Sequence, residues 1–501
     1  QEKVNMATVE LLPEVTAFLA RQQGHFIHGR AIPGSTHDRA EIRNPANGEL
    51  ITTVARATED EVEEAIASSY SAFKGTWAQT APAERERILM RFADLIEEHG
   101  EEIAQLETLQ SGKLLALSRM IEVGWAAQFL RYYAGWATKI SGETLSPSIP
   151  SIKGEQYTAM TLRAPIGVVF GIIPWNFPVM IPIWKLGAAL ATGNTALLKS
   201  ASPTPLSLLR VAELGKEAGL PDGALNVING PGRIGDQIIP DERIAKVTLT
   251  GSVRTGNIIA EKAMKANLKR VTLELGGKNA AGFLPDMSIE EIVDGIFEAG
   301  FLHSGQICAS AERFLIHSSQ IDDVEAALRE RLIGIEAADP MDEEAAFGPV
   351  ATQDQYDKVL EAFDIAKKEG DRIVVGGEAY NRPGFYVKPT VIRPKSLDST
   401  SWREEIFGPV ATLATFDSEE ELIHEMNDTP YGLTASVWTH DLSKAMRLIP
   451  QIEAGTVWVN MHTIVDPSVP FGGAKGSGIG REYGSAFIED YTELKSVMIR
   501  Y

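Results

Sequence analysis

From residue 164 onward, short runs of β-branched and other apolar residues alternate with stretches of helical periodicity. The run IGVVFGII is continuous and apolar, as expected of a parallel strand that is covered on both faces. Four more strand-like runs follow at intervals of about 15–30 residues (NTALLKS, ALNVING, KVTLTGS and RVTLEL). This alternation predicts a doubly wound parallel sheet. A second alternating series, from 286 to about 455, predicts a second α/β domain.

The uncharged segment 164–184 (APIGVVFGIIPWNFPVMIPIW) is long enough to cross a membrane as a helix. Four prolines interrupt it, and each interior proline costs a helix about 3 kcal/mol. We therefore expect a buried strand, then an irregular loop, and a helix only over 186–191, with no membrane contact. Upstream, helical periodicity predicts helices over 56–75, with Thr58 as the cap, and over 82–100 and 101–117.

Charge and cysteine usage exclude several classes of protein. The 501 residues carry 47 Lys and Arg against 68 Asp and Glu, a net charge of −21, so a nucleic-acid partner is not expected. Cys308 is the single cysteine, which rules out an intrachain disulfide and favours a reducing, cytoplasmic location. One cysteine, nine histidines and no HExxH motif argue against a metal site. The first 15 residues show no signal-peptide pattern.

Three residues have both a structural and a catalytic interpretation. Cys308 in FLHSGQICAS is either a core cysteine or a thiolate nucleophile, and its small, polar neighbours favour the second. Glu274 in VTLELGG is either a solvated edge-strand residue or a buried general base with a raised pKa. Asn176 in IPWNFP is either a turn residue or an amide that donates to an oxyanion. In TGSVRTG, two glycines follow a strand and precede a helix N-terminus that suits a phosphate.

Taken together, these segments resemble the aldehyde dehydrogenase family over nearly the whole chain. The motifs occur in the family's order: PWNFP (174–178), LLKSASPTP (197–205), TGSVRTG (250–256), LELGGKN (273–279), GQICAS (305–310), EEIFGPV (404–410) and PFGGAKGSGIGRE (470–482). The resemblance implies a Rossmann-like cofactor domain (1–141 and 165–276), a second α/β catalytic domain (277–476) and a small β oligomerisation arm (142–164 and 477–501). It also implies a homo-oligomer, with a tetramer favoured.

The resemblance assigns a role to each candidate. Cys308 corresponds to the nucleophile, Glu274 to the general base, Asn176 to the oxyanion amide, and Glu482 to a supporting acidic residue. The cofactor-binding set that it implies is Ile172, Trp175, Lys199, Ser202, Gly232, Gly251, Ser252, Gly256, Leu275, Glu405 and Phe407. The presence of Glu274 favours release of the product by hydrolysis over transfer to coenzyme A.

The resemblance also implies NAD as the cofactor. Ser202 stands where many NAD-preferring members carry a glutamate, whose charge would repel the 2′-phosphate of NADP. We therefore expect NAD to be used and NADP to be tolerated.

The substrate is expected to be an apolar aldehyde, oxidised to the acid through a cysteine thiohemiacetal and thioester. Three regions are expected to line its tunnel: the helix over 125–133, residues 177–184 and the loop 461–468. The aromatic side chains of Trp125, Phe177, Trp184 and Phe471 favour an aromatic substrate such as phenylacetaldehyde. Two alternatives stay open: a betaine-type or aliphatic aldehyde dehydrogenase, and a catalytically silent structural protein on the same fold.

Overall fold

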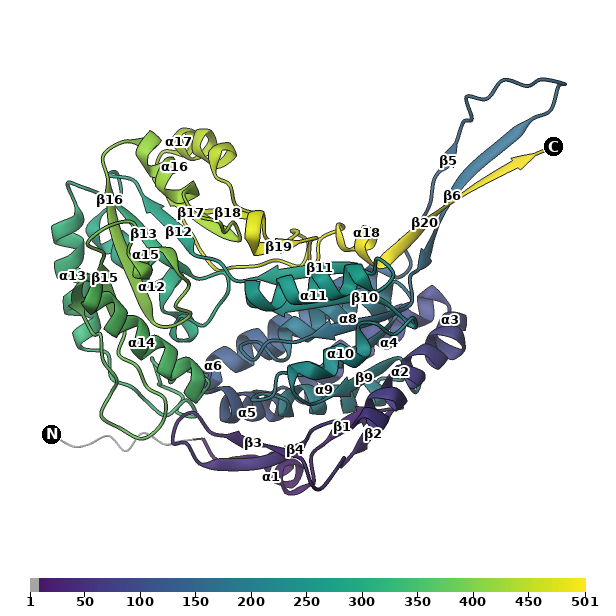
Figure 1. The fold of residues 1–501 in the computed structure, drawn as a ribbon, viewed down its shortest axis with the longest axis horizontal. Helices are drawn as coiled ribbons and strands as arrows, with labels where there is room; N and C mark the ends of the chain where they lie inside the picture. Colours follow the sequence, from purple (N-terminus) through teal and green to yellow (C-terminus); the bar gives the residue numbers. More distant parts are fainter. Residues whose placement is uncertain (1–8) are drawn as a thin grey trace.

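The computed structural model describes residues 9–501, which form two α/β lobes and a projecting β arm (Figure 1). The expected fold class, a cofactor-type α/β domain followed by a second α/β domain and a small β arm, is confirmed. No helix within residues 9–501 is long and apolar enough to cross a membrane.

The first lobe is built on an eight-stranded sheet. In spatial order its strands are β19 (Gly478–Ile479), β11 (Arg270–Leu275), β10 (Ile244–Gly251), β7 (Val168–Ile172), β8 (Thr195–Lys199), β9 (Leu225–Ile228), β1 (His25–Ile27) and β2 (Arg30–Ile32). The five strands from β11 to β9 are parallel. The chain order reverses at β7, because β8 pairs with one edge of it and the later strand β10 with the other. Such a switch point opens a crevice at the carboxyl ends of the strands.

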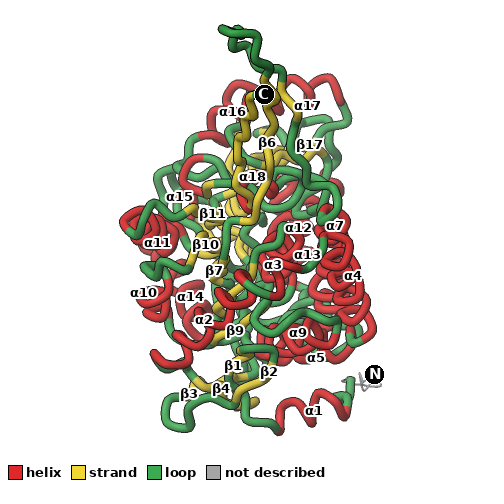
Figure 2. Tube along the Cα trace, turned by 90° about the vertical axis from the view of Figure 1, so that its right-hand side faces the viewer, coloured by secondary structure: helices red, strands yellow, loops and turns green. Residues whose placement is uncertain are grey.

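Helices cover both faces of this sheet (Figure 2). Helices α2, α10 and α11 pack on one face, and α4, α5, α7, α8 and α9 pack on the other. The helices of this lobe are α1 (Pro13–Ala20), α2 (Glu59–Lys74), α3 (Thr76–Gln79), α4 (Pro82–Glu98), α5 (Gly100–Ser111), α6 (Leu115–Leu117), a π-helix (Ser118–Trp125), α7 (Ala126–Trp136), α8 (Met180–Ala191), α9 (Leu206–Glu217), a 3₁₀ turn (Gly232–Ile234), α10 (Gly235–Ile238), α11 (Val253–Lys265) and α18 (Phe487–Tyr491). A separate hairpin joins β3 (Arg39–Arg43) to β4 (Leu50–Ala55).

Most helix boundaries follow local sequence signals, but the end of α5 and the start of α8 differ from the prediction. Thr58 caps the start of α2, as its sequence predicts, and the Glu61 side chain bonds back to the Thr58 N–H, which makes the cap reciprocal. The helix expected over 101–117 instead ends at Ser111, because Gly112 adopts a left-handed conformation.

Helix α8 begins at Met180, six residues before the expected start. Pro182 is the third residue of α8, in the first turn, where its missing N–H has no intrahelical partner to lose. The carboxylate of Glu122 accepts hydrogen bonds from the N–H groups of Val179 (3.1 Å) and Met180 (2.7 Å), and so satisfies two free donors at this helix end.

The second lobe is built on a seven-stranded sheet, parallel except for the antiparallel strand β14. Its order is β14 (Arg372–Val375), β15 (Thr390–Arg393), β16 (Val410–Phe416), β13 (Ala311–His317), β12 (Asn279–Phe283), β17 (Thr434–Trp438) and β18 (Thr456–Val459). Its helical segments are α12 (Ile289–Gly300), a 3₁₀ turn (Leu302–Gly305), α13 (Ile321–Ile333), α14 (Gln353–Glu369), α15 (Thr400–Arg403), α16 (Glu419–Asn427), α17 (Leu442–Leu448) and two more 3₁₀ turns (Ile449–Gln451 and Lys475–Ser477). Helices α12 and α13 cover one face, and α14, α15 and α16 the other.

A three-stranded antiparallel sheet forms the arm, which leaves the body of the molecule at the upper right of Figure 1. Its strands are β20 (Thr492–Arg500), β6 (Tyr157–Pro165) and β5 (Thr144–Leu145). Residues 478–491, assigned to the arm by the resemblance, lie elsewhere: β19 joins the first sheet and α18 packs on α8.

Candidate active site

Cys308 lies in a tight loop between the 3₁₀ turn that follows α12 and strand β13. His303, Ser304 and Gly305 have positive φ values of 50°, 52° and 72°. Three consecutive left-handed residues are costly for the backbone, and such strain persists where the surrounding structure imposes it.

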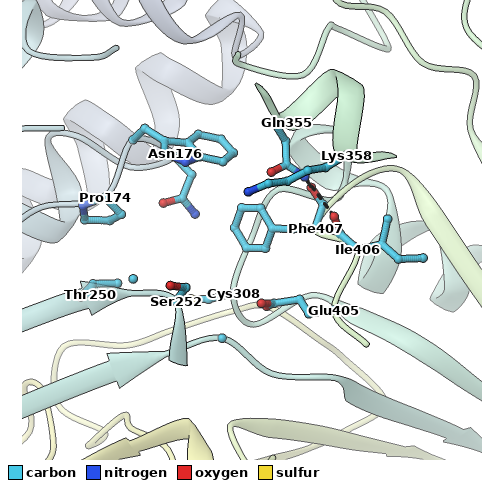
Figure 3. Close-up of a pocket in the computed structure, with 13 residues that line it drawn as sticks. Pro174, Asn176, Thr250, Ser252, Cys308, Gln355, Lys358, Glu405, Ile406 and Phe407 are labelled. Atoms are coloured by element: carbon cyan, nitrogen blue, oxygen red, sulfur yellow. Dashed lines mark hydrogen bonds between the residues drawn. The ribbon is translucent and has the colours of Figure 1, made fainter. Parts of the chain in front are cut away.

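The side chain of Cys308 lines two cavities, one on each side of it. One cavity, of about 310 Å³, is lined largely by residues that follow β7 and β10 and by the segment Glu405–Phe407 (Figure 3). The other, of about 290 Å³, is lined mainly by aromatic and aliphatic side chains. The cysteine is partly exposed rather than sealed in the core. Its sulfur is therefore accessible to molecules bound on both sides.

Burial raises the pKa of the Cys308 thiol to about 12, with smaller contributions from the charges of Glu274 and Glu405. The cysteine is thus a neutral thiol at pH 7 in this structure. Formation of a thiolate requires a positive charge nearby or a base that removes the proton.

Asn176 lies in the loop between β7 and α8, on the cysteine side of the first cavity. Its side-chain Nδ2 donates a hydrogen bond to the main-chain oxygen of Gln306 over 2.9 Å, two residues before Cys308. A primary amide carries two N–H donors. One of them fixes the orientation of the side chain, and the other stays available to a developing oxyanion.

Glu274 is buried, with 3% of its surface exposed, so the solvated edge-strand interpretation is wrong. It is the second-to-last residue of strand β11, and within residues 9–501 neither carboxylate oxygen has a hydrogen-bond partner. Burial raises the pKa of Glu274 well above its usual value, and the neighbouring charge of Glu482 raises it further. A carboxyl group in this environment holds a proton strongly, as a general base must.

Glu482 is buried beside Glu274 and forms an ion pair with Lys185 of α8. Lys185 Nζ lies 2.8 Å from one Glu482 carboxylate oxygen and 3.0 Å from the Thr248 hydroxyl. The other oxygen of Glu482 has no hydrogen-bond partner among the described residues. This arrangement keeps a negative charge close to Glu274.

Five of the predicted cofactor-binding residues line the first cavity: Trp175, Gly251, Ser252, Glu405 and Phe407. The ring of Trp175 packs edge-on against Phe407, with centroids 5.5 Å apart. Glu405 accepts a hydrogen bond from Gly277 N–H over 3.1 Å. Burial raises the pKa of Glu405 to about 8, and the charge of Glu312 adds to this shift.

The other predicted cofactor residues lie outside this cavity. Ile172 and Lys199 are paired at the carboxyl ends of β7 and β8, the edge onto which the N-terminus of α11 opens. Burial lowers the pKa of Lys199 to about 8. Ser202 is exposed and donates to Gly230 O over 3.3 Å, and Gly232 begins the next 3₁₀ turn.

Gly256 and Leu275 touch each other. A Cβ atom at Gly256 would lie 2.6 Å from the Leu275 side chain, so this glycine lets α11 pack closely on the sheet.

All four predicted substrate residues, Trp125, Phe177, Trp184 and Phe471, line the second cavity. The expected tunnel helix is displaced, however. On this side the second cavity is lined by Met120, Ile121 and Trp125 of the π-helix. Tyr133, at the other end of the expected helix, is fully buried and does not line the cavity.

The expected loop 461–468 lines the second cavity through residues 462–465. Several lining residues were not predicted, among them Gln355 and Lys358 of α14 in the first cavity and Glu298 of α12 in the second. No motif marks these positions, because ordinary helix-surface residues come to the site only through lobe packing. Hydrophobic periodicity within one segment does not show which side chains of a helix face the other lobe.

Three comparisons identify the family. The profile of the aldehyde dehydrogenase family matches residues 32–497. The chain is 43% identical over 479 residues to phenylacetaldehyde dehydrogenase of Pseudomonas fluorescens, and the match covers 95% of each chain. It is 40% identical over 475 residues to a betaine aldehyde dehydrogenase of Cereibacter sphaeroides, which covers 95% of this chain and 96% of the relative. The fold matches an NAD⁺ complex of aldehyde dehydrogenase from Bacillus cereus, with a TM-score of 0.94, 41% identity, and 98% and 99% coverage.

The doubly wound fold and its matches to solved enzymes define an α/β enzyme. The chain belongs to the aldehyde dehydrogenase family, and it is an oxidoreductase of that family.

Proposed function

We propose that this chain oxidises an apolar aldehyde to the carboxylic acid with NAD as the hydride acceptor, phenylacetaldehyde being the favoured substrate. One observation carries the proposal: Cys308 forms part of the wall of both an apolar cavity and a cavity at the switch point of the sheet. An aldehyde in the apolar cavity and a nicotinamide in the cavity at the switch point would both reach the same sulfur. The relative from Pseudomonas fluorescens supports the choice of substrate.

The residues of the cavity at the switch point fit a dinucleotide. The loops after β7 and β10 and the N-terminus of α11 meet at the carboxyl edge of the sheet. Glu405 supplies a carboxyl group for ribose hydroxyls, and Lys199 supplies a cation at the same edge. When bound, NAD⁺ brings a positive charge and accepts a hydride.

In this proposal Cys308 is the nucleophile. The thiol proton passes to solvent water. The thiolate sulfur then bonds to the aldehyde carbon, and the carbonyl oxygen takes the negative charge. The free N–H of the Asn176 amide and the main-chain N–H of Cys308 hold that oxygen. Loss of hydride from the same carbon leaves a thioester on Cys308.

Glu274 then removes a proton from water, and the resulting hydroxide attacks the thioester carbon. The carbon–sulfur bond breaks, so the acid leaves and the thiolate is restored. Among the described residues the buried Glu274 carboxylate has no competing hydrogen bond, and its raised pKa strengthens it as a base.

Ser202 supports tolerance of NADP. It is exposed, uncharged and close to the carboxyl edge that carries Lys199, so no carboxylate at this position would repel a 2′-phosphate. We propose NAD as the main cofactor and NADP as a second one.

A betaine-type aldehyde is a second candidate, favoured by one feature of the apolar cavity. Glu298 is the one charged side chain among its described lining residues, and aromatic rings form the walls. Aromatic faces and a carboxylate attract quaternary ammonium groups. The same carboxylate would repel anionic aldehydes.

The arm supports assembly of identical subunits, with a tetramer favoured. Leu494 and Met498 on β20 are 48% and 56% exposed. An extended sheet with unpaired edges and exposed apolar residues needs a covering surface. The presence of one cysteine in the sequence is consistent with a cytoplasmic enzyme.

NADH formation, followed at 340 nm over a panel of aldehydes, tests the proposal. We expect the highest kcat/KM for phenylacetaldehyde, lower values for betaine aldehyde and short aliphatic aldehydes, and negligible turnover of carboxylated aldehydes. A Cys308→Ala variant should be inactive. Oxidation by that variant would overturn the mechanism, and a preference for short aliphatic aldehydes would overturn the aromatic assignment.

A further inference from the structure

A buried ion pair contacts the main chain of Glu405–Phe407, the segment that we propose binds the cofactor and that we call the cofactor segment. Lys278, in the turn after β11, and Glu312, on β13, are 1% and 4% exposed. Lys278 Nζ lies 2.5 Å from a Glu312 carboxylate oxygen. Neither residue lines either of the two cavities that meet at Cys308.

Glu312 also accepts hydrogen bonds from the main chain of the cofactor segment. Its carboxylate accepts from Ile406 N–H at 3.0 Å and from Phe407 N–H at 2.7 Å. The opposite side of the segment is held as well, because Gln355 Nε2 donates to the carbonyl oxygens of Ile406 (2.9 Å) and Phe407 (2.8 Å), as Figure 3 shows. The segment is thus fixed through both its N–H and its C=O groups.

The backbone of Phe407 is strained, with a φ value of 57°. A left-handed conformation is a genuine outlier for a bulky aromatic residue and persists only when its surroundings impose it. The carboxylate of Glu312 bonds to the N–H of this residue and of the one before it. The strain therefore coincides with the point at which the ion pair holds the chain.

We propose that Lys278 and Glu312 are positioning residues for the cofactor, which act by holding the Glu405–Phe407 segment in its strained conformation before the nicotinamide end binds. The inference rests on the proposed function, because it takes this segment to contact NAD. A buried ion pair gives little net stability relative to an apolar pair of similar size. Its distinctive contribution here is an acceptor for two N–H groups that no apolar residue could satisfy.

The loop that carries Cys308 is held by hydrogen bonds from a different residue. Asn279 Nδ2 donates to the carbonyl oxygens of Cys308 (2.7 Å) and Ser310 (2.8 Å). Replacement of the ion pair should therefore affect the cofactor segment more than the cysteine loop, and this difference provides the test.

A matched pair of double variants isolates the acceptor. K278M/E312Q and K278M/E312L are both uncharged and similar in size, but only the first keeps a carbonyl oxygen for the two N–H groups. We expect the KM for NAD of K278M/E312L to exceed that of K278M/E312Q by about tenfold. Acylation of Cys308 by 4-nitrophenyl acetate without NAD, measured by release of 4-nitrophenolate, should agree between the two variants within about twofold.

Equal KM values for NAD in the two variants would overturn the inference, as would a parallel loss of ester acylation, since the pair would then support the cysteine loop. If K278M/E312L does not fold, hydrogen exchange of wild-type residues 404–409 decides: we expect slow exchange before NAD is added. Fast exchange that slows only with NAD would overturn the inference. Absence of NAD-dependent oxidation in the wild type would instead refute the proposed function itself.

Discussion

The side-chain amide of Asn176 and the main-chain oxygen of Gln306 are joined by a 2.9 Å hydrogen bond between two loops that are 130 residues apart in sequence. This bond connects the loop after β7 to the loop that carries Cys308, across the two lobes. It sets the direction of the second amide N–H, on which the proposed oxyanion site depends.

Removal of that amide should slow the chemical step. In Asn176→Ala we expect kcat to fall by about a hundredfold to a thousandfold, the range seen when one oxyanion donor is lost. The KM for the aldehyde should change little. Steady-state kinetics measure both quantities, and thermal unfolding controls for the lost bond to Gln306. The side chain has no oxyanion role if Asn176→Ala keeps kcat within about threefold of the wild type.

Glu274→Gln should separate the two halves of the reaction. Oxidation to the thioester does not need the base in the proposed mechanism, whereas hydrolysis does. We therefore expect a first-turnover burst of NADH followed by little steady-state turnover, recorded by stopped-flow absorbance. Normal steady turnover would contradict the assignment of Glu274 as the base, and loss of the burst would place Glu274 in the first half.

The preference between NADP and NAD should depend on pH through Lys199. Because burial lowers its pKa to about 8, Lys199 is charged at pH 7 and becomes neutral as the pH rises above 8. The 2′-phosphate of NADP depends on this charge more than the ribose of NAD does. We expect the ratio of kcat/KM for NADP to that for NAD to fall between pH 7 and pH 9.5. Lys199→Arg, which stays charged, should keep the ratio constant.

A glutamate at position 202 should restore exclusion of NADP. In Ser202→Glu we expect kcat/KM for NADP to fall by about tenfold to a hundredfold while that for NAD changes little. Ser202→Gln is the uncharged control. Equal effects of the two substitutions would show that charge is not the cause.

Glu298 should distinguish cationic from neutral aldehydes. Its carboxylate lies in the wall of the apolar cavity and accepts a hydrogen bond from His462 N–H over 2.9 Å. Glu298→Gln keeps an acceptor for that bond and removes the charge. We expect a several-fold loss of kcat/KM for betaine aldehyde and an unchanged value for phenylacetaldehyde. An equal loss for both substrates would indicate a purely structural effect.

Charges on the apolar side of the arm should disrupt assembly. Leu494→Lys combined with Met498→Lys is expected to lower the mass measured by sedimentation, and Lys495→Gln on the same strand is the control. The 54.5 kDa wild-type chain should sediment as a multiple of that mass. A monomeric wild type would rule out the assembly proposed from the arm.

Local patterns were sufficient for the strands and for the main candidates. Buried parallel strands are visible in the sequence as continuous apolar runs. Cys308, Glu274 and Asn176 lie in short segments with distinctive neighbours. The sequence also placed four aromatic residues that the structure brings to one cavity. The start of helix α8 was predicted six residues too far along the chain. A proline in the first turn of a helix cannot be distinguished in the sequence from one that breaks a helix.

The residue sequence by itself determined the α/β alternation and the chemical groups available for catalysis, because both depend on side chains close together in the chain. Tertiary structure alone decided that Cys308 separates two cavities, that Gln355 and Lys358 reach one of them, and that Glu312 holds the backbone of Phe407. Those contacts join segments far apart in sequence. Their formation depends on how two sheets and their helices pack, which periodicity within a single segment does not encode.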